Sequence, residues 1–257
     1  MGARLDQHFL VDQHIRDSII DVADIGPQDR VLEIGPGRGF LTEALLKRAR
    51  EVMAVEMDER LIARLDEAVG KPPHLRVICA DFLQLKLESL EPGPWKVVAN
   101  LPYAVATPIL QRLLTWPHWQ VAVLMFQKEV AERITAAPGC GDYGLLTLSA
   151  QVHASSEIVL EVPRESFAPR PQVASAVVRL MRRPEPLVSD REQKVFFRVI
   201  HAAFSQRRKM ALGLLARSLN LPRERVAEAF VTEKIALAAR AEEISLEQFQ
   251  GLALRLF

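Results

Sequence analysis

Cysteine is scarce in this chain, which has only Cys79 and Cys140 among its 257 residues. Two thiols are too few for a disulfide scaffold or for a zinc module built on four cysteines. Cys79 lies in the apolar run 75–80, where we expect a buried and unreactive thiol. A long hydrophobic run is also missing: the longest is 121–126, whereas a helix that crosses a bilayer needs about 20 apolar residues.

A secretory signal is not visible either, since the first 12 residues carry Arg4, Asp6 and Asp12 and contain no apolar stretch. An overall charge of one sign is absent as well, because 33 basic and 32 acidic side chains give a net charge of +1. With 49% apolar and 25% charged residues, the composition is that of a globular protein. We therefore expect a cytoplasmic protein with no membrane partner.

The charge is unevenly distributed along the chain. Residues 1–180 hold 19 basic and 23 acidic side chains, whereas residues 181–257 hold 14 basic and nine acidic ones. Within the second part, residues 182–217 contain nine basic and three acidic side chains. This local excess indicates an anionic partner near that segment. A solvated helix face would carry the same charges and is the alternative interpretation.

The chain is long enough for one large domain and one small domain. Short apolar runs alternate with helical segments through the first half, at residues 30–35, 51–56, 75–80, 96–99 and 119–126. Because these runs are apolar throughout, they predict parallel strands in a sheet that is covered on both faces. Two later runs, 158–162 and 174–181, have little helix between them and predict an antiparallel pair at one edge.

The pattern changes after residue 181. Residues 182–186 are charged and contain two prolines, which is typical of a linker, and the periodicity from Asp190 onward is helical. Asp58 and Ser245 are predicted to cap helices at their N-termini. We predict an α/β domain with a doubly wound, mostly parallel sheet and an antiparallel edge, followed by a small all-α domain. The predicted ranges are 1–183 and 184–257.

A glycine-rich loop follows the first predicted strand and has the sequence Glu33-Ile34-Gly35-Pro36-Gly37-Arg38-Gly39. Glycines at alternate positions let the backbone turn tightly and approach a ligand closely. A dinucleotide-binding loop would need a further glycine at position 40, which is Phe40. The loop resembles that of S-adenosylmethionine (SAM) methyltransferases, whose cofactor has no pyrophosphate, with Gly35 and Gly37 beside the ligand. A tight turn without a ligand is the alternative.

Carboxylates mark the ends of the next two predicted strands. Glu56 lies 21 residues after Gly35, where a carboxylate can accept hydrogen bonds from both hydroxyls of a ribose. Asp81 can accept from an adenine amino group, while the backbone N–H of Phe82 serves a ring nitrogen. An exposed strand-end acid and a turn cap are the alternatives for Glu56 and Asp81. In series at one sheet edge, the two residues favour an adenosine site.

The fourth predicted strand ends in the most specific motif, Asn100-Leu101-Pro102-Tyr103. The exocyclic amine of adenine is a poor nucleophile because its lone pair is delocalised into the ring. Hydrogen bonds from this amine to the Asn100 side-chain oxygen and the Leu101 carbonyl would localise the lone pair. Pro102 fixes the turn and leaves no competing donor, and Tyr103 offers a stacking surface for an extruded base. A plain strand end is the alternative.

A second aromatic residue, Phe167, opens the proline-rich segment 167–175. Its ring could hold the other face of the base, and a buried core phenylalanine is the alternative. Sequence motifs of other chemistries are absent, namely G-x-S-x-G, H-E-x-x-H, the P-loop and the zinc-deaminase motif. The six histidines show no metal-ligand spacing, so no metal is predicted.

Taken together, these motifs resemble those of the ribosomal RNA adenine N6,N6-dimethyltransferase family. Leu101 and the segment 203–210 favour its small-subunit branch over the branch that acts on large-subunit RNA. The similarity spans nearly the whole chain and implies a Rossmann-like SAM methyltransferase fold with a helical, RNA-binding C-terminal domain. The motifs that carry it are Gln7-His8-Phe9-Leu10, residues 33–39, Glu56, Asp81, residues 100–103 and residues 167–175.

The resemblance also implies roles for individual residues. Gly35 would contact the methionine part of SAM, Glu56 its ribose and Asp81 its adenine. The residues that would cover the cofactor are Gln7, His8 and Leu10. Basic residues of the helical domain would contact RNA phosphates, which position an enzyme without reading sequence; they are Arg198, Arg207, Arg208 and Lys209.

The expected reaction is the transfer of two methyl groups from SAM, with S-adenosylhomocysteine (SAH) as product, to N6 of each of two adjacent adenosines. These would lie in the 3′-terminal hairpin of 16S rRNA in an immature 30S subunit, and the enzyme would be a monomer that needs no metal. One alternative is a ribosome assembly factor whose main role is to bind immature small subunits. The other is the same chemistry on large-subunit rRNA.

Overall fold

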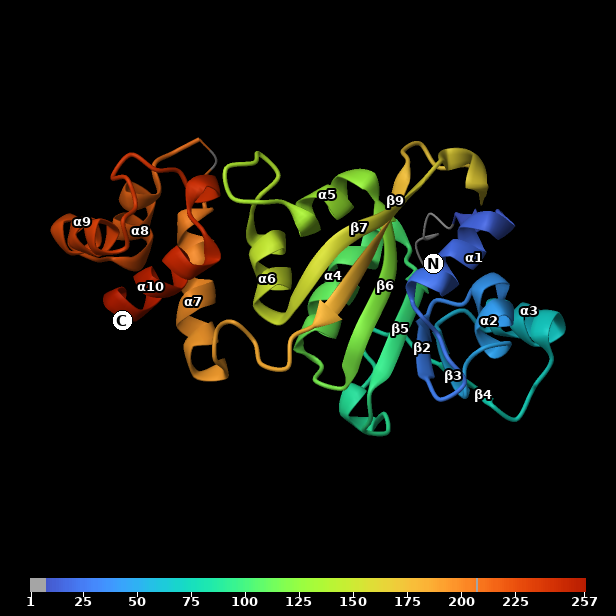
Figure 1. Ribbon diagram of the computed structural model, residues 1–257. Coiled ribbons are helices and arrows are strands. Elements are labelled where there is room, and N and C mark those ends of the chain that lie inside the picture. Colours follow the sequence, from blue (N-terminus) through green and yellow to red (C-terminus); the bar gives the residue numbers. More distant parts are fainter. Residues whose placement is uncertain (1–7, 207) are drawn as a thin grey trace. The chain divides into compact units, whose positions relative to one another are not determined.

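The computed structural model describes residues 8–206 and 208–257 (Figure 1). Gln7 and Arg207, two of the predicted site residues, lie outside this part. The chain forms two compact units: the first runs up to Ala131 and resumes over Ser155–Arg182, and the second comprises Glu132–Ala154 and Arg183–Phe257. The predicted division at residue 183 therefore differs from the structure in residues 132–154. These residues join the second unit because Leu148 and Val152 pack in its core.

The first unit contains a seven-stranded sheet with the strand order β4-β3-β2-β5-β6-β9-β7 (Figure 1). Strands β4, β3, β2, β5 and β6 are parallel, and β9 is antiparallel to β6. The predicted mostly parallel sheet with an antiparallel edge is confirmed, with β9 lying between β6 and β7. The bounds are β2 (Arg30–Ile34), β3 (Glu51–Glu56), β4 (Leu75–Cys79), β5 (Trp95–Asn100), β6 (Trp119–Gln127), β7 (Ala154–Val162) and β9 (Ser175–Arg182).

Apolar side chains cover both faces of this sheet. Successive residues of a strand point to opposite faces, so Val31 and Leu32 lie on different sides, and both are fully buried. On the face of Val31, the helices α1 and α2 contribute Ile19 and Leu45 to the core. The helices of the first unit are α1 (Gln13–Val22), α2 (Phe40–Leu46), α3 (Glu59–Val69) and α4 (Tyr103–Thr115), and α5 (Lys128–Thr135) begins in this unit and ends in the second.

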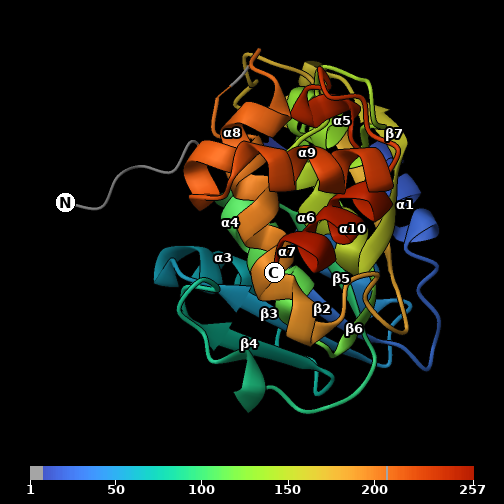
Figure 2. The same ribbon diagram turned by 90° about the vertical axis from the view of Figure 1, so that its left-hand side faces the viewer.

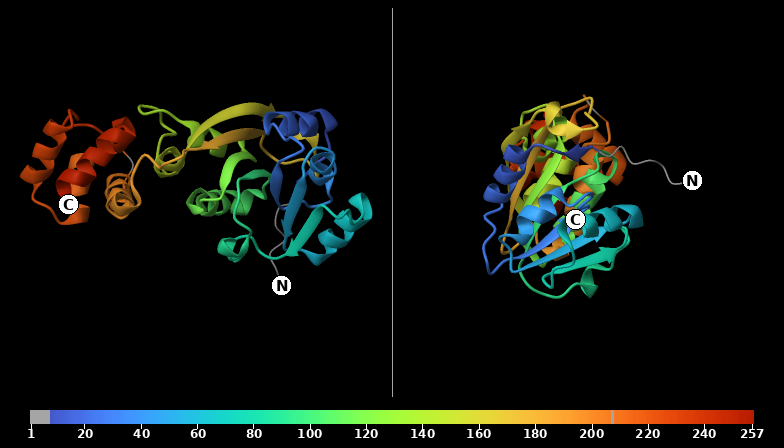
Figure 3. Two further views of the ribbon diagram at one scale, coloured as in Figure 1. Left: turned by 60° about the horizontal axis from the view of Figure 1, so that its bottom comes forward. Right: turned by 90° about the vertical axis from the view of Figure 1, so that its right-hand side faces the viewer.

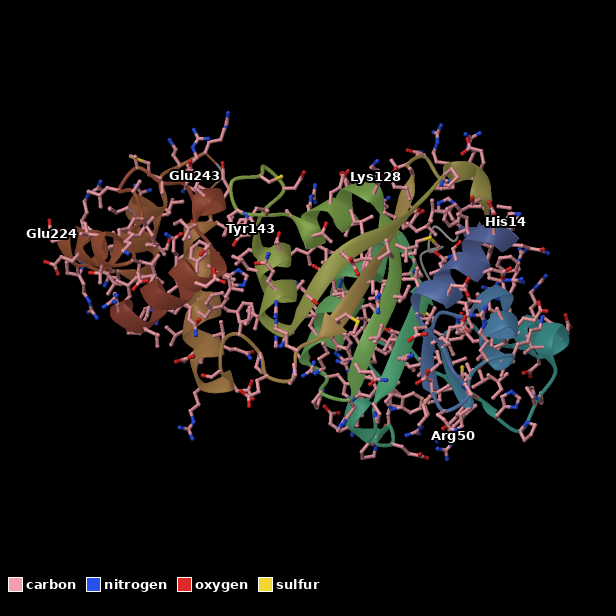
Figure 4. All side chains as sticks on the ribbon, in the orientation of Figure 1. His14, Arg50, Lys128, Tyr143, Glu224 and Glu243 are labelled. Atoms are coloured by element: carbon pink, nitrogen blue, oxygen red, sulfur yellow. The ribbon has the colours of Figure 1, made fainter. Side chains whose placement is uncertain are left out.

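A small second sheet ties the N-terminal segment to a distant part of the chain. Strand β1 (Phe9–Leu10) pairs antiparallel with β8 (Phe167–Ala168), which follows the 3₁₀ turn η2 (Arg164–Ser166). Figures 1 and 3 show α1, in blue, beside this yellow segment. Polar side chains such as His14 on α1 and Arg50 before β3 project outward (Figure 4).

The second unit is helical, as predicted, and has its own core around Phe196, Leu215 and Phe249. Its helices appear together in Figure 2. The predicted N-caps are confirmed, since Ser245 caps α10 in this unit and Asp58 caps α3 in the first. The helices are α6 (Leu145–His153), α7 (Asp190–Ala203), α8 (Ala211–Leu219), α9 (Arg223–Thr232) and α10 (Leu246–Leu256).

The prediction for Cys79 is wrong, because the structure places this thiol in an exposed position. Strand β4 lies at the edge of the sheet, where it pairs only with β3, and none of its residues is buried. Among the described residues, no helix is both long and apolar enough to cross a membrane.

Candidate active site

A cavity of about 640 Å³ opens at the carboxyl ends of β2, β3, β4 and β5. This edge of a doubly wound sheet is where ligands bind, and the volume suits a small molecule. The cavity brings together eleven of the residues predicted for the site. They are His8, Leu10, Gly35, Gly37, Glu56, Asp81, Phe82, Asn100, Leu101, Pro102 and Tyr103.

The glycine-rich loop adopts a backbone that side chains rarely tolerate. Gly35, Gly37 and Gly39 have φ angles of +69°, +58° and +84°, a region open mainly to glycine. A Cβ atom on Gly37 would lie 3.2 Å from Cε1 of Phe9, and one on Gly39 would lie 2.8 Å from Cδ1 of Leu65. The loop therefore needs glycine both for its turn and for the approach of its neighbours.

The carboxylate of Glu56 is buried and held by three backbone donors. Its Oε1 accepts from the N–H groups of Met57 (2.9 Å) and Asp58 (3.0 Å), and its Oε2 accepts from Gly37 (3.3 Å). A carboxylate offers about four lone-pair sites. One site on Oε2 therefore stays open to a ligand, and displacement of the long Gly37 contact would open a second.

Asp81 caps a turn, as its alternative interpretation had it, and also lines the cavity. Its Oδ1 accepts from the N–H of Leu83 at 2.9 Å, which caps the turn after β4. Its Oδ2 accepts no hydrogen bond from the described residues, and Asp81 lines the cavity together with the buried Phe82. The turn cap thus fixes one oxygen of the carboxylate and leaves the other for a ligand.

Asn100 is oriented by its amide nitrogen, and Tyr103 by its hydroxyl. Nδ2 of Asn100 donates to the backbone oxygen of His8 at 3.2 Å, so the side-chain oxygen is the atom left for a ligand. The hydroxyl of Tyr103, in the first residue of α4, is hydrogen-bonded to the buried Ser175 at 2.6 Å. Burial raises the pKa of Tyr103 above its ordinary value.

His8 joins the N-terminal segment to this group. Its Nδ1 lies 2.8 Å from the carbonyl oxygen of Pro169. Because a carbonyl only accepts, Nδ1 carries the proton. The imidazole ring lies 5.5 Å from the ring of Tyr103, at an angle of 34°. The pairing of β1 with β8 thus places His8 and Leu10 at the cavity.

Phe167 is not at the cavity. It is 4% exposed and packs in the core with Ile19 and Val177, as its alternative interpretation had it. The structure does not place its ring where it could meet a base. Sequence reasoning missed Phe9, which lines the cavity, contacts Gly37 and has the Arg38 guanidinium 4.3 Å above its ring. The position of Phe9 inside the N-terminal motif was the available signal.

Glu33 is the first residue of the glycine-rich motif, and the motif alone indicates no role for it. It lines the cavity, is 1% exposed, and accepts a hydrogen bond from the Thr42 hydroxyl at 2.7 Å. Burial raises the pKa of Glu33 to about 8; the Thr42 hydrogen bond opposes this shift and the charge of Glu56 adds to it. A carboxyl group in this state is largely protonated at neutral pH.

The predicted RNA contacts are spread over the second unit. Arg208 and Lys209 are exposed in the turn between α7 and α8. Arg198, on α7, is exposed and lies with its guanidinium 4.6 Å from the ring of the C-terminal Phe257. The C-terminus and the α7–α8 turn are at opposite ends of this unit (Figure 1).

The residues around the cavity fit SAM. Glu56 and Asp81 keep acceptor atoms for the ribose and adenine, Phe82 and Leu101 supply apolar surface, and the glycine loop leaves room at the cavity wall. In the part of the chain that the structure describes, no group of three or more side chains could hold a metal ion.

Residues 2–256 match the family model described as ribosomal RNA adenine dimethylase. Proteins named ribosomal RNA small subunit methyltransferase A are similar over nearly the full length. That of Bacillus cytotoxicus is 42% identical over 97% of this chain and 89% of its own. That of Clostridium botulinum is 42% identical over 97% and 91%, and that of Moorella thermoacetica 40% over 96% and 89%.

Two solved structures resemble the whole chain. The 23S rRNA methyltransferase ErmE has a TM-score of 0.77 and 33% identity, covering 96% of this chain and 99% of its own. A dimethyladenosine transferase from Plasmodium falciparum has a TM-score of 0.78 and 27% identity, covering 95% and 96%. These matches confirm the predicted Rossmann-like methyltransferase fold. The chain therefore belongs to the ribosomal RNA adenine dimethylase family and is a SAM-dependent rRNA adenine dimethyltransferase.

Proposed function

We propose that this enzyme dimethylates N6 of two adjacent adenosines in the 3′-terminal hairpin of 16S rRNA, with an immature 30S subunit as substrate. The observation that carries the proposal is the identity of 40–42% to relatives named small subunit methyltransferase A. The identity to the 23S rRNA methyltransferase structure is lower, at 33%. Leu101 and the segment 203–210 support the same branch.

The cavity binds the cofactor, in this proposal, through residues that the sequence motifs singled out. Glu56 accepts from the ribose hydroxyls, Asp81 and the N–H of Phe82 meet the adenine, and Gly35 with Gly37 lets the methionine part approach the backbone. His8 and Leu10, together with Gln7, cover the bound molecule. SAM supplies a methyl group that a sulfonium makes electrophilic.

The Asn100–Tyr103 motif acts on the target adenine. The free oxygen of Asn100 and the carbonyl of Leu101 accept from the N6 amine and localise its lone pair on nitrogen. Pro102 holds the turn, and Tyr103, anchored by Ser175, stacks on the extruded base. Orientation and preplaced acceptors supply the rate enhancement. The N6 proton becomes acidic once the methyl group is attached and passes to solvent, so no general base is needed.

The helical domain, residues 184–257, binds the RNA backbone in this proposal. Exposed cations that meet phosphates add affinity without sequence preference. The enzyme acts as a monomer in the cytoplasm, where ribosomal subunits assemble. The residues proposed for these contacts are Arg198, Arg207, Arg208 and Lys209.

Methyl transfer from labelled SAM to small subunits that lack the modification tests the proposal. Mass spectrometry should find dimethyladenosine at two adjacent positions of the 3′-terminal hairpin. Label in large-subunit RNA would move the enzyme to the other branch. Tight binding to small subunits without incorporation would favour an assembly factor, and a catalytically inactive variant that still binds subunits and disturbs growth would support the same reading.

A further inference from the structure

Glu33 is a buried carboxyl at the cavity that the proposed chemistry does not use. It lies in β2, and its neighbours in register on β3 and β5 are the apolar residues Ala54 and Val98. The Thr42 hydroxyl is its one hydrogen-bond donor among the described side chains, and none of their cations forms an ion pair with it. A carboxylate without a nearby cation is unstable in such surroundings. In the ligand-free cavity Glu33 is therefore protonated.

The other charges at the cavity favour a cationic ligand. Glu56 faces Glu33 from β3 and opposes its ionisation. Arg38 is exposed and lies over the ring of Phe9. The remaining ionisable residues that line the cavity are Glu43, Asp81, Tyr103 and His8. SAM and SAH share the ammonium and carboxylate of their methionine part and differ at the sulfur, which is a methylated, positively charged sulfonium in SAM and a neutral thioether in SAH.

We propose that Glu33 discriminates SAM from SAH by giving up its proton when the sulfonium cofactor binds and regaining one when the thioether product remains. On binding, the proton passes from the Glu33 carboxyl to solvent, and the carboxylate that forms is stabilised by the positive charge. Once the sulfonium has become a thioether, its charge no longer stabilises the carboxylate, which then takes a proton from water. Product release thus leaves the cavity in its original state. The inference rests on the SAM dependence of the family and not on the proposed RNA target.

Calorimetric titration of the full chain, without RNA, measures this proton directly. Titrations in buffers that differ in ionisation enthalpy give the number of protons released per ligand bound. At pH 7 we expect close to one proton for SAM and less than half of one for SAH. Linkage then requires SAM to bind about tenfold more tightly at pH 8 than at pH 6.5. SAH affinity should change by less than about twofold.

Three variants assign the proton to Glu33. Glu33→Gln should abolish the release, flatten the pH dependence and reduce the preference for SAM over SAH about tenfold. His8→Asn, which removes the imidazole ring that lines the same cavity, should keep the release. Thr42→Val keeps the carboxyl but removes the donor that favours its charged form, and should move the pH dependence to higher pH.

Equal proton release with SAM and SAH would overturn the inference, as would unchanged release in Glu33→Gln. Thermal unfolding checks that each variant is folded, and the wild-type comparison and Thr42→Val decide the matter if Glu33→Gln does not fold. Because these titrations contain no RNA, a negative result would not affect the proposal that 16S rRNA is the substrate. Failure of methyl transfer to small subunits would likewise leave the proton count standing.

Discussion

Three side chains at the cavity share one arrangement: one polar atom is hydrogen-bonded to the protein, and another has no hydrogen-bond partner among the residues that the structure describes. Asn100 commits Nδ2 to the backbone of His8, Asp81 commits Oδ1 to its own turn, and His8 commits Nδ1 to Pro169. The committed atom fixes the side-chain rotamer before a ligand arrives. Such preorganisation lowers the entropic cost of forming the productive geometry.

Asn100→Ala tests this arrangement at the reacting amine. Loss of the acceptor should lower kcat by about 10²–10³-fold, while the affinity for SAM stays within about twofold because Glu56 and Asp81 are intact. Turnover with labelled SAM and a calorimetric titration measure the two quantities. Unchanged turnover would remove Asn100 from the mechanism.

The raised pKa of Glu33 also makes stability depend on pH. An acid whose pKa is higher in the folded state than the ordinary 4.5 binds protons more tightly when folded. Its contribution to stability is fully present below pH 4.5 and is lost as the pH rises to about 8. Glu33→Gln should therefore match the wild type near pH 4.5 and exceed it at pH 8 by a few kcal/mol, on the order of 1.4 per pKa unit. Denaturant unfolding at both pH values provides the measurement, and an equal difference at both would contradict the burial argument.

For single residues, the sequence predicts their position along a strand better than it predicts the burial of their side chains. Glu56, Asp81 and Asn100 were located because each ends a strand, and parallel strands bring those ends to one edge. The burial of Cys79 and Phe167 depends on which strand lies next to theirs. The periodicity of apolar residues does not indicate that neighbour. An edge strand exposes Cys79, whereas pairing of β8 with β1 draws Phe167 into the core.

Among the elements, the position of the segment from β1 to α1 is fixed by the hydrogen bonds of one residue, Asp12. Asp12 caps α1 by accepting from the N–H groups of His14 and Ile15, and it also accepts from the hydroxyl of Ser166. These hydrogen bonds, that of Ser166 foremost, lower the pKa of Asp12. The start of α1 is therefore tied to the turn before β8, and β1 lies between the two.

Asp12→Ala should destabilise the protein by about 1 kcal/mol and weaken SAM binding, because β1 then holds His8 and Leu10 less firmly. The matched control is Ser245→Ala, which removes the N-cap of α10 in the other unit. It should lose comparable stability without changing SAM affinity. Thermal unfolding and calorimetry compare the two, and equal effects on SAM binding would refute the role of the segment.

The glycine loop offers a second contrast. Gly39→Ala places a Cβ 2.8 Å from Leu65 at a positive φ angle, and should destabilise the protein by about 1–3 kcal/mol. Gly141→Ala adds the same atom where no heavy atom lies within 4 Å and should be nearly neutral. Midpoints of urea unfolding would distinguish them; similar midpoints would show that Leu65 and the loop adjust freely.

Across the whole molecule, the cavity lies in the first unit, and the exposed Arg208 and Lys209 lie in the second. Effects on SAM binding and on RNA binding should therefore be separable by mutation. Lys209→Gln should lower the slope of log affinity for RNA against log salt by about 0.7–0.9 and leave SAM affinity unchanged. Arg223→Gln removes an equally exposed charge at the start of α9 and serves as control. Filter binding across a salt series gives the slopes, and identical slopes for both variants would remove Lys209 from the interface.

The domain division is the part of the fold that the sequence reveals least. Residues 182–186 carry the charges and prolines of a linker, so the return of the chain to the second unit could be predicted. Residues 132–154 also belong to the second unit, but no charged or proline-rich linker precedes them in the sequence. A largely apolar helix such as α6, none of whose residues is exposed, presents the same pattern whichever core receives it, and the choice depends on long-range packing with residues such as Phe196.

The first unit is interrupted by residues 132–154, which belong to the second. This order along the chain decides which apolar surfaces have not yet met their packing partners during synthesis. Leu148 and Val152 leave the ribosome well before Val188 and Phe196, with which they share a core. Strand β6 likewise emerges before β9, its partner on one side. A nascent chain that has emerged from the ribosome as far as about residue 160 thus exposes the apolar side chains of α6 and an open edge of β6 together. Both features favour chaperone binding or aggregation, so we expect the speed of translation through the following region to affect the yield of folded enzyme.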